Sequence, residues 1–404
     1  MRLLKKETPL TIGGVKIPYS CETLQFLLVG ATGTGKTTAE EEIVTTLGSR
    51  PDARMIIVDP GGNLLSKYYK QGDKILNPFD RRSEPWSIFN EVRKNYDCDR
   101  LAKSIVPDGV GGDKSWHHYA QVLISETMLA LAKKGEATTE ALIKWVTQSK
   151  VADLENLLLG TAASGLFDEN AAKALASTRF VATSHLNPHK YLRSGEFSLR
   201  SWLTEEKGSL FITFREDMAE SLKPLIGCWV DVIANAVLSL NPDHNRRLYF
   251  LLDELPSLGR VNAMESLLVR GRKFGVCVFG MIQSTSQLDY LYGREQAIVL
   301  RSCFRNLLVL GGSKTDFDTA EELSKGLGEV EVDRTQYNSS SSLAGPSKGR
   351  SLQRVTERLV LPNEIAELPN LEGFFALAGN HSTKRICLSP QSLRQVVPPF
   401  EEDE

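Results

Sequence analysis

The stretch LLVGATGTGKTTAEEEIV, residues 27–44, constrains the fold of this 404-residue chain more than any other. An apolar run stops at Gly30, and a Glu-rich helical pattern follows Thr37. The residues from one to the other match G-x-x-x-x-G-K-T, whose glycines let backbone N–H groups face a phosphate. The helix that follows adds the positive end of its dipole. We therefore predict a strand over Leu24–Val29, a helix over Thr38–Thr46 and a nucleotide held by the loop between them.

The side chains of this loop have distinct expected roles. Lys36 would neutralise the β- and γ-phosphates, and the Thr37 hydroxyl would bind Mg²⁺. ATP is the expected nucleotide, because the sequence has no N-K-x-D stretch of the kind that selects GTP. The alternative is a glycine-rich turn with a purely structural role. The residues expected to line the nucleotide are Gly30, Ala31, Thr32, Gly33, Thr34, Gly35, Lys36, Thr37 and Thr38.

A second acidic element follows at LYFLLDE, residues 248–254, an apolar run that ends in two carboxylates. Asp253 suits the Mg²⁺ shell, and Glu254 can polarise the attacking water. The pair could instead be a charge pair at a helix N-terminus. Asp59 also ends an apolar run, and we assign it a supporting role because no glutamate follows it.

Polar residues further along the chain extend this site. Gln283 ends a predicted strand over residues 275–282, where it could sense the γ-phosphate or orient water. A glutamine in a surface turn is the alternative. Arg270, Arg272 and Lys273 precede the same strand. An arginine near a γ-phosphate stabilises the transition state, although exposed arginines are more often solvated.

Composition limits the class of protein. The hydrophobic fraction of 41% and the charged fraction of 24% are typical of a globular chain. A net charge of −2 gives no sign of nucleic-acid binding from bulk charge. The N-terminus lacks the apolar core of a signal peptide. The longest apolar stretch, 224–240, contains Asp231 and Asn235 and is short for a bilayer, so we predict a helix buried against a sheet.

The order of patterns predicts an α/β protein with a mainly parallel sheet, formed by residues 1–83 and 201–404. Residues 84–200 show helical periodicity and are expected to form an all-α insertion. We predict a mobile loop at 337–351 and a tail over 391–404, whose last residues, EEDE (401–404), are expected to be solvated and frayed. Hairpins are expected at TIGGVKIP, residues 11–18, and from GFFALAG to KRICLSP, residues 373–390.

These motifs in this order resemble the TraD/TrwB-type coupling proteins of bacterial conjugation, which are RecA-like hexameric ATPases of type IV secretion systems. The similarity covers most of residues 11–390. It implies that Asp253, Glu254 and Gln283 complete an ATP and Mg²⁺ site, together with Arg272 from the neighbouring subunit. It also implies that the all-α part faces the cytoplasm near the entrance of a central channel.

The resemblance implies an ATP-driven DNA translocase that forms a homohexamer and moves DNA, with a relaxase, to a type IV secretion channel. A non-motor ATP-binding platform that recruits secretion substrates is one alternative. A septal-type translocase of double-stranded DNA is another, although no basic winged-helix tail is visible. The candidate DNA contacts are Lys348, Arg350 and Arg354.

The sequence departs from the family in one respect. Family members usually carry N-terminal transmembrane helices, and this sequence contains none. We therefore expect either the cytoplasmic part of a longer protein or a soluble relative. The expected location is the cytoplasmic face of the bacterial inner membrane, reached only through a segment outside this chain.

Overall fold

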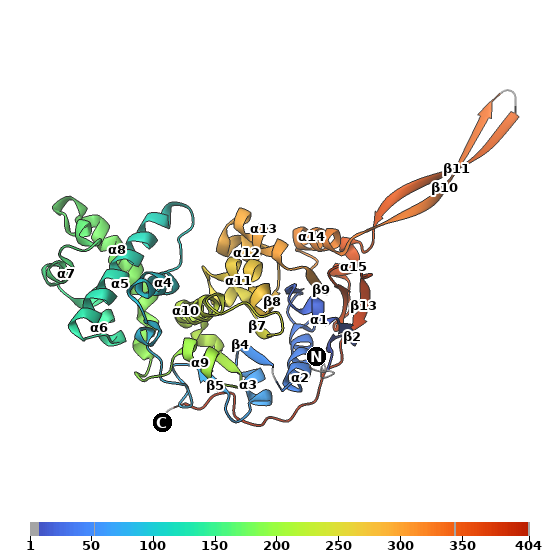
Figure 1. Cartoon of the computed structure of the whole chain (residues 1–404). Helices are drawn as coiled ribbons and strands as arrows, with labels where there is room; N and C mark the ends of the chain where they lie inside the picture. Colours follow the sequence, from blue (N-terminus) through green and yellow to red (C-terminus); the bar gives the residue numbers. More distant parts are fainter. Residues whose placement is uncertain (1–7, 52, 343–344, 403–404) are drawn as a thin grey trace.

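The computed structural model describes residues 8–51, 53–342 and 345–402, and within 337–351 it describes the backbone and the Arg350 side chain alone. A nine-stranded sheet forms the centre, in the order β13-β12-β9-β3-β8-β7-β4-β6-β5 (Figure 1). The strands from β9 to β5 run parallel, whereas β12 is antiparallel to both β9 and β13. The prediction of a mainly parallel α/β sheet is confirmed. Its strands are β3 (Phe26–Val29), β4 (Arg54–Pro60), β5 (Lys74–Leu76), β6 (Leu210–Phe214), β7 (Leu248–Leu252), β8 (Val276–Ile282), β9 (Asn306–Leu310), β12 (Glu372–Ala376) and β13 (Lys384–Cys387).

Helices cover both faces of this sheet, which explains why its strands are continuous apolar runs. On one face lie α2 (Lys36–Gly48) and α3 (Asn63–Tyr68), whose buried side chains share a core with Phe26 and Leu28. The other face carries the core that contains Val29. The helices on that face are α10 (Ala219–Leu238), α11 (Met264–Arg270), α12 (Ser286–Tyr292), α13 (Arg294–Cys303) and α14 (Phe317–Leu327).

Helix α10 is the longest apolar element of the sheet domain. Among the described residues, Glu216–Leu238 is the one segment long and apolar enough to be a candidate membrane span. Its most apolar window is 72% buried inside the protein, and Trp229 within it is almost fully buried. The segment is therefore a core helix, as the sequence predicted.

Between β5 and β6 every regular element is helical. The helices α4, α5 and α8 pack on one another beside the sheet domain (Figure 1). An isolated β-bridge between Trp86 and Phe197 pairs the segment that enters this region with the segment that leaves it. The boundaries at residues 84 and 200 stay a prediction. The longer elements are α4 (Asn95–Ile105), α5 (Lys114–Lys134), α6 (Thr139–Ile143), a π-helix (Lys144–Gln148), α7 (Val151–Leu158), α8 (Ala172–Leu186) and α9 (Leu199–Glu205).

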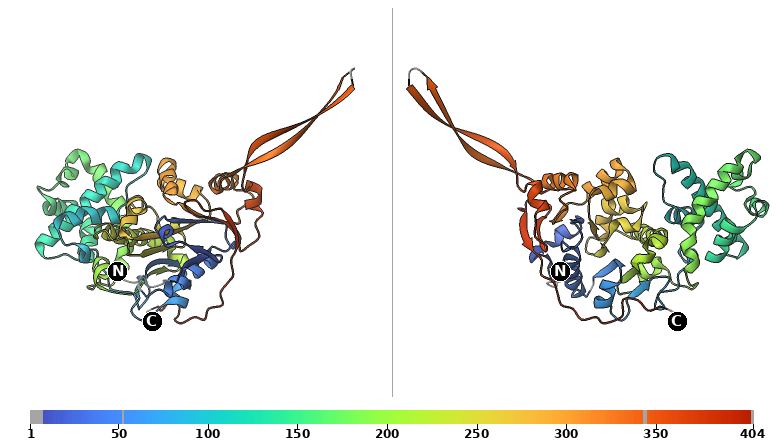
Figure 2. Two further views of the ribbon diagram at one scale, coloured as in Figure 1. Left: turned by 45° about the vertical axis from the view of Figure 1, so that its right-hand side comes forward. Right: turned by 180° about the vertical axis from the view of Figure 1, so that it is seen from behind.

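The prediction of a mobile loop at 337–351 is wrong in secondary structure. The described residues of this range lie in an antiparallel ribbon formed by β10 (Glu329–Ser342) and β11 (Gly345–Arg358), whose residues are paired along both strands; residues 343 and 344 lie outside the described residues. The ribbon leaves the body in every view (Figures 1 and 2). Residues 337–351 are mostly small and polar and show no alternating apolar pattern, so the sequence did not predict that they pair as strands.

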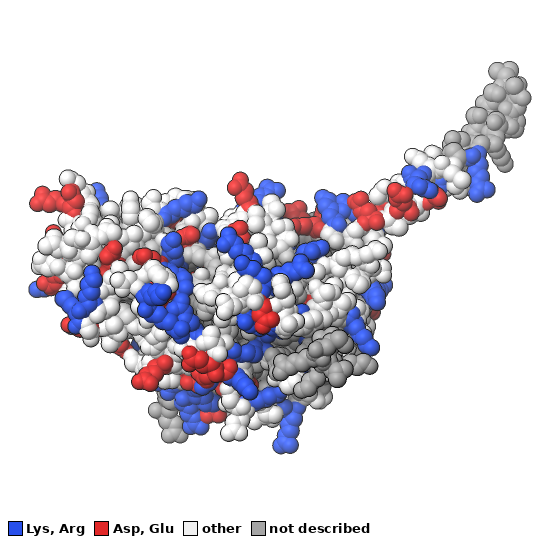
Figure 3. Space-filling view, viewed as in Figure 1, with Lys and Arg blue, Asp and Glu red and all other residues white. Residues whose placement is uncertain are grey.

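Ion pairs link the two strands at the base of the ribbon, and one of them, Arg354 with Asp333, joins residues that lie opposite each other. Arg354 Nε lies 3.2 Å from Asp333 Oδ1, and Arg334 Nη2 lies 2.6 Å from Glu357 Oε1. Side chains of both signs therefore alternate along the described part of the ribbon (Figure 3). Cross-strand pairs of opposite charge stabilise an antiparallel register.

The described part of the tail, residues 391–402, makes contacts that the sequence did not predict. Of EEDE, the end predicted to be solvated and frayed, the structure describes Glu401 and Glu402, and Glu402 is exposed although both are paired; residues 403 and 404 lie outside the described residues. The tail runs back along the body (Figure 2), and the backbone N–H of Val396 donates to Ser66 O. Glu401 pairs with Arg81, and Glu402 pairs with Arg215. These partners are more than 180 positions away in sequence, so composition alone gave no sign of them.

The two predicted hairpins are present. The first pairs β1 (Leu10–Ile12) with β2 (Val15–Ile17), and the second pairs β12 with β13. Short helices α1 (Tyr19–Glu22) and α15 (Pro362–Ala366) complete the fold.

Candidate nucleotide-binding site

The predicted strand, loop and helix around the P-loop are confirmed, as β3 and α2. Gly33 and Gly35 have φ angles of +81° and +119°, a region that favours glycine. A Cβ atom at Gly30 would lie 2.6 Å from Thr34 Oγ1 and 2.8 Å from Leu310 Cβ. The loop therefore depends on these three glycines for its shape.

Lys36 begins α2 and turns back over the loop. Its Nζ donates to the carbonyl oxygens of Gly30, at 2.6 Å, and Ala31, at 3.1 Å. Burial lowers the pKa of Lys36, and the nearby carboxylates of Glu254 and Asp253 oppose that shift. The cation is thus already held at the loop, where phosphate oxygens could replace the two carbonyls. Thr37, the next residue, is exposed.

The carboxyl ends of β3, β8 and β7 meet at one edge of the sheet, because β8 pairs with both of the others. Asp253 and Glu254 directly follow β7, and Gln283 directly follows β8. Gln283 Nε2 donates to Glu254 Oε2 at 3.4 Å. The predicted residues Lys36, Asp253, Glu254 and Gln283 are therefore brought together.

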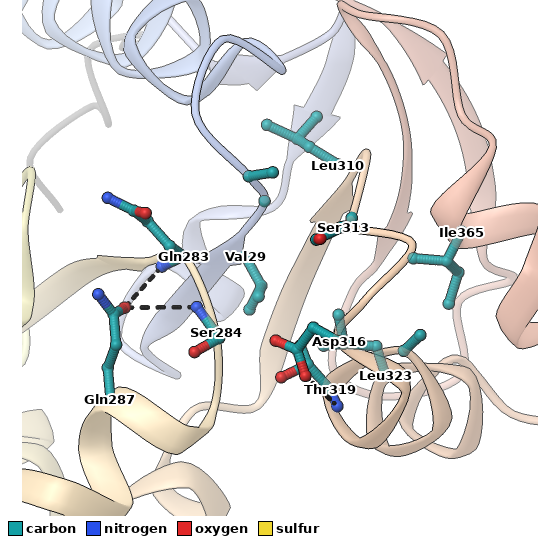
Figure 4. Close-up of a pocket in the computed structure, with 14 residues that line it drawn as sticks. Val29, Gln283, Ser284, Gln287, Leu310, Ser313, Asp316, Thr319, Leu323 and Ile365 are labelled. Carbon is teal, nitrogen blue, oxygen red and sulfur yellow. Dashed lines mark hydrogen bonds between the residues drawn. The ribbon is translucent and has the colours of Figure 1, made fainter.

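Gln287 is a site residue that the sequence reasoning missed. Its Oε1 accepts hydrogen bonds from the backbone N–H of Gln283, at 2.9 Å, and of Ser284, at 3.3 Å (Figure 4). Its Nε2 donates to Glu254 Oε1 at 3.4 Å. Two glutamines thus hold one carboxylate. Gln283 and Gln287 are four positions apart across the start of a helix, and this spacing could have predicted that their side chains lie close together.

Gln283, Ser284 and Gln287 also line a cavity of about 190 Å³ (Figure 4). Its wall is apolar at Val29, Leu310 and Leu323 and polar at Ser313 and Asp316. It lies between the turns that follow β8 and β9, so movement of Gln283 would change its shape.

Burial raises the pKa values of several acidic residues in the site. It raises the pKa of Asp253 and of Glu254 above their ordinary values. It also raises the pKa of Asp59 to about 7, against the hydrogen bonds from the start of α3. Asp59 Oδ2 accepts from the backbone N–H of Leu65 at 2.7 Å. Asp59 therefore holds the turn after β4, and its supporting role stays a prediction.

Glu40 is a further carboxyl group that the sequence reasoning missed. It lies one turn after Lys36 in α2, and its side chain is fully buried beside Asp253. Burial, followed by the charges of Asp253 and Asp59, raises its pKa well above the ordinary value. Its side chain also shares a hydrogen bond with the carboxyl group of Asp253.

The residues present fit a Mg²⁺ ion. The Thr37 hydroxyl and the Asp253 carboxylate are hard oxygen ligands, and the Glu40 carboxyl group lies against that of Asp253. Within the described ranges, no three His, Cys, Asp or Glu side chains are placed to hold a metal ion by themselves. This arrangement suits an ion bound mainly through nucleotide phosphates, as is usual for Mg²⁺.

The sequence also assigns the chain to a family. Residues 9–389 match the type IV secretion-system coupling protein DNA-binding domain. The chain belongs to this family of coupling proteins.

Solved structures agree with this assignment. The unbound monoclinic form of the bacterial conjugative coupling protein TrwBdeltaN70 matches with a TM-score of 0.92 and 43% identity, covering 98% of this chain and 92% of that chain. The plasmid coupling protein TrwB in complex with ADP and Mg²⁺ matches with a TM-score of 0.91 and 42% identity, over the same shares of both chains. The predicted RecA-like α/β fold with a helical part is confirmed.

A curated relative is considerably longer than this chain. Coupling protein TraD from Escherichia coli (strain K12) is 29% identical over 424 residues, which cover 99% of this chain. The chain spans 58% of the length of TraD. The resemblance to TraD/TrwB-type coupling proteins is confirmed.

The three basic residues before β8, Arg270, Arg272 and Lys273, lie at the opposite end of this strand from Gln283. Arg272 and Lys273 are exposed in a 3-10 turn, Gly271–Phe274, that precedes β8, and exposed Arg270 ends α11. Gln283 lies at the other end of this seven-residue strand, about 23 Å away at 3.3 Å per residue. The fold therefore does not bring Arg272 to the site of the same chain.

The candidate DNA contacts lie on the ribbon, far from the P-loop in sequence and in Figure 1. Arg350 is exposed, and Arg354 is exposed but pairs with Asp333 and Glu331. The side chain of Lys348 lies outside the described residues. The choice of these three as DNA contacts stays a prediction.

Proposed function

We propose that this coupling protein is an ATPase that moves DNA during bacterial conjugation. The observation that carries the proposal is the meeting of Lys36, Asp253, Glu254 and Gln283 at one edge of the sheet. Structures of TrwB in complex with ADP and Mg²⁺, and with an ATP analogue that cannot be hydrolysed, support a nucleotide at this position. Another TrwB structure contains a GTP analogue, so we do not propose that the loop itself selects the base.

The chain's own residues account for hydrolysis as follows. Lys36 exchanges the carbonyl oxygens of Gly30 and Ala31 for phosphate oxygens and neutralises the charge that develops on them. Glu254 accepts a hydrogen bond from the attacking water, and the two glutamines fix the direction of its carboxylate. Thr37 and Asp253 hold Mg²⁺, which supplies positive charge at the β- and γ-phosphates when it is bound.

We propose that the complete site forms between two copies of the chain in a homohexameric ring. Arg272 is exposed, precedes β8, a strand about 23 Å long that separates it from Gln283 of the same chain, and forms no ion pair among the described residues. An arginine in this position is available to the neighbouring subunit. Its guanidinium would then complete the neighbour's site at the γ-phosphate.

DNA, a relaxase and type IV secretion components are the proposed partners, at the cytoplasmic face of the inner membrane. The family match is to a DNA-binding domain, which supports DNA as a partner. The helical region over residues 84–200 and the ribbon with Arg350 are the proposed contact regions. The chain spans 58% of the length of TraD. A partner that binds to the remaining part of such a protein would not contact the residues of this chain.

The test is steady-state ATP turnover with and without single- and double-stranded DNA. We expect turnover that DNA stimulates, and its loss in Lys36→Ala together with loss of nucleotide binding. Glu254→Gln should bind ATP but hydrolyse it slowly, because removal of a general base costs about 10²–10⁴-fold. Binding of ATP without turnover in the parent protein would contradict the motor and favour a recruitment platform.

A further inference from the structure

The turn that follows β8 is held by side chains from two helices. The backbone N–H groups of Gln283 and Ser284 donate to Gln287 Oε1, which belongs to the helix directly after the turn. The next N–H group, that of Thr285, donates to Thr319 Oγ1 at 3.2 Å. Thr319 lies in α14, 34 positions further along the chain. The turn that carries Gln283 is therefore anchored to a separate element of the fold.

Helix α14 buries two hydroxyl side chains beside its apolar ones. Thr319 is 6% exposed and Ser324 is 0% exposed. Buried polar groups form hydrogen bonds in stable proteins, and each of these two binds a segment outside the helix. Thr319 binds the turn after β8, and Ser324 Oγ donates to the carbonyl oxygen of Val360 at 2.6 Å. The apolar buried residues of the helix are Ala320, Leu323 and Leu327.

The base of the ribbon is fixed to the same helix. Strand β10 begins two residues after α14 ends, and Leu359, directly after β11, donates its backbone N–H to Gly328 O at 3.0 Å. Arg358, the last residue of β11, has its Nη2 3.2 Å from Glu321 Oε1 of α14. One helix therefore contacts both the turn at the ATP site and the base of the ribbon.

The turn and α14 are separated in part by the cavity of about 190 Å³. Gln283 and Ser284 line it on one side, and Asp316 and Thr319 line it on the other (Figure 4). Among the described residues, no other side chain of α14 forms a hydrogen bond with residues 283–285. The contact of Thr285 with Thr319 is therefore the polar connection between the turn and the helix.

We propose that Thr319 is a positioning residue for Gln283, and that α14 carries a change at this turn to the base of the ribbon. The proposal rests on the proposed ATP site, in which Gln283 contacts the γ-phosphate. ATP has this phosphate and ADP lacks it, so the two nucleotides differ in their contacts with the turn. A ligand shifts a conformational equilibrium through such a difference.

The first part of the test is ATP turnover by the full chain. Thr319→Val removes the hydroxyl and keeps the shape of the side chain. We expect its kcat to fall by up to about 10²-fold with an unchanged KM, because a small misplacement of a reacting group has such an effect. Thr319→Ser keeps the hydroxyl and should restore most of the rate.

Thr127→Val is the matched control. Thr127 is 0% exposed in α5, and its hydroxyl donates to Leu123 O of the same helix at 2.7 Å. Both valine variants lose one buried hydrogen bond, so both should melt somewhat below the parent. A purely structural role of Thr319 therefore predicts equal turnover in the two variants, whereas a positioning role predicts parent turnover in Thr127→Val alone.

The second part is hydrogen exchange followed by mass spectrometry, with ADP and with an ATP analogue that cannot be hydrolysed, both in Mg²⁺. In the parent, exchange should differ between the two nucleotides at the turn, 283–288, and at α14 and the ribbon base, 317–332 and 354–361. In Thr319→Val the difference should remain at the turn and be lost at α14 and the ribbon base.

Three results would overturn the inference and leave the proposed function intact. They are a parent-like kcat in Thr319→Val, an equal fall in Thr127→Val, and exchange at the ribbon base that is the same with both nucleotides in the parent or that still responds to them in Thr319→Val. A parent protein that binds neither nucleotide would overturn the proposed ATP site, and this inference with it.

Discussion

Glu254 is expected to activate water, yet its position depends on side chains from another strand. Gln283 and Gln287 each donate to one of its oxygens, at 3.4 Å. Gln287 also accepts from the backbone at Gln283, so a single side chain couples the end of β8 to the carboxylate. The arrangement of the reacting groups therefore depends on Gln287 as much as on the residues that sequence motifs identify.

We predict that Gln287→Ala binds ATP like the parent but turns it over more slowly, by up to about 10²-fold, because a small misplacement of a reacting group has such an effect. Binding by calorimetry and turnover under saturating ATP measure the two quantities. Gln148→Ala, at an exposed position of the π-helix in the helical region, is the control and should keep parent turnover. An unchanged rate in Gln287→Ala would show that Gln283 alone positions Glu254.

Elements differ in how far the sequence predicted them. Strands such as β3 and β7 were predictable because they are apolar runs that end in functional residues. The ribbon was missed because its pairing depends on register and on ion pairs such as Arg354 with Asp333, not on an apolar pattern. The tail was missed because its partners, such as Arg81, lie far away in the sequence.

The same contrast holds within the site. Lys36 and Glu254 were predictable from spacing, because each belongs to a short motif. Glu40 was not, because a glutamate in a Glu-rich helix is usually exposed, and its burial follows only from the packing of α2 against the sheet. Arg272 was identified through resemblance, and its role across an interface stays a prediction.

The ribbon is expected to be dispensable for folding. Two-stranded ribbons contribute little stability by themselves, and this one leaves the body (Figure 2). We predict that deletion of residues 334–353, with Asn-Gly joining Asp333 to Arg354, keeps the melting temperature and ADP affinity. DNA-stimulated turnover should fall, because Lys348 and Arg350 are removed. Full stimulation by DNA in the shortened protein would exclude the ribbon as a DNA contact.

His189 gives the helical region a predictable acid sensitivity. It lies in a 3-10 turn, Asn187–Tyr191, with its ring 6.2 Å from that of Trp86, and burial lowers its pKa to about 3. The unfolded chain binds a proton near pH 6.5 and the folded chain does not, so this residue's contribution to stability is lost as the pH falls below 6.5.

We predict that the free energy of unfolding of His189→Leu depends less steeply on pH than that of the parent. Between pH 6 and pH 4, the slope of the free energy of unfolding against pH should be steeper in the parent than in His189→Leu. The two slopes should differ by close to 1.4 kcal/mol per pH unit, the value for one proton at about 25 °C. Urea unfolding at several pH values measures it. Identical slopes in the two proteins would show that His189 takes up a proton in the folded state.

At the scale of the whole molecule, the position of Arg272 is the feature that suggests a ring. One chain holds a P-loop at the carboxyl edge of its sheet and an exposed arginine at the amino end of β8. A site that requires both is complete only when a second copy is present. Hydrolysis in one subunit would then depend on the position of the next, as a motor requires.

The measurement that tests this most directly is turnover in mixtures of Arg272→Ala and Lys36→Ala proteins. Each variant alone should be nearly inactive, although Arg272→Ala should bind ATP like the parent. Mixing should restore part of the activity, because some interfaces then join an intact P-loop to an intact arginine. Light scattering checks that the two variants assemble together. A mixture that assembles but stays inactive, or an Arg272→Ala protein with parent turnover, would contradict the account.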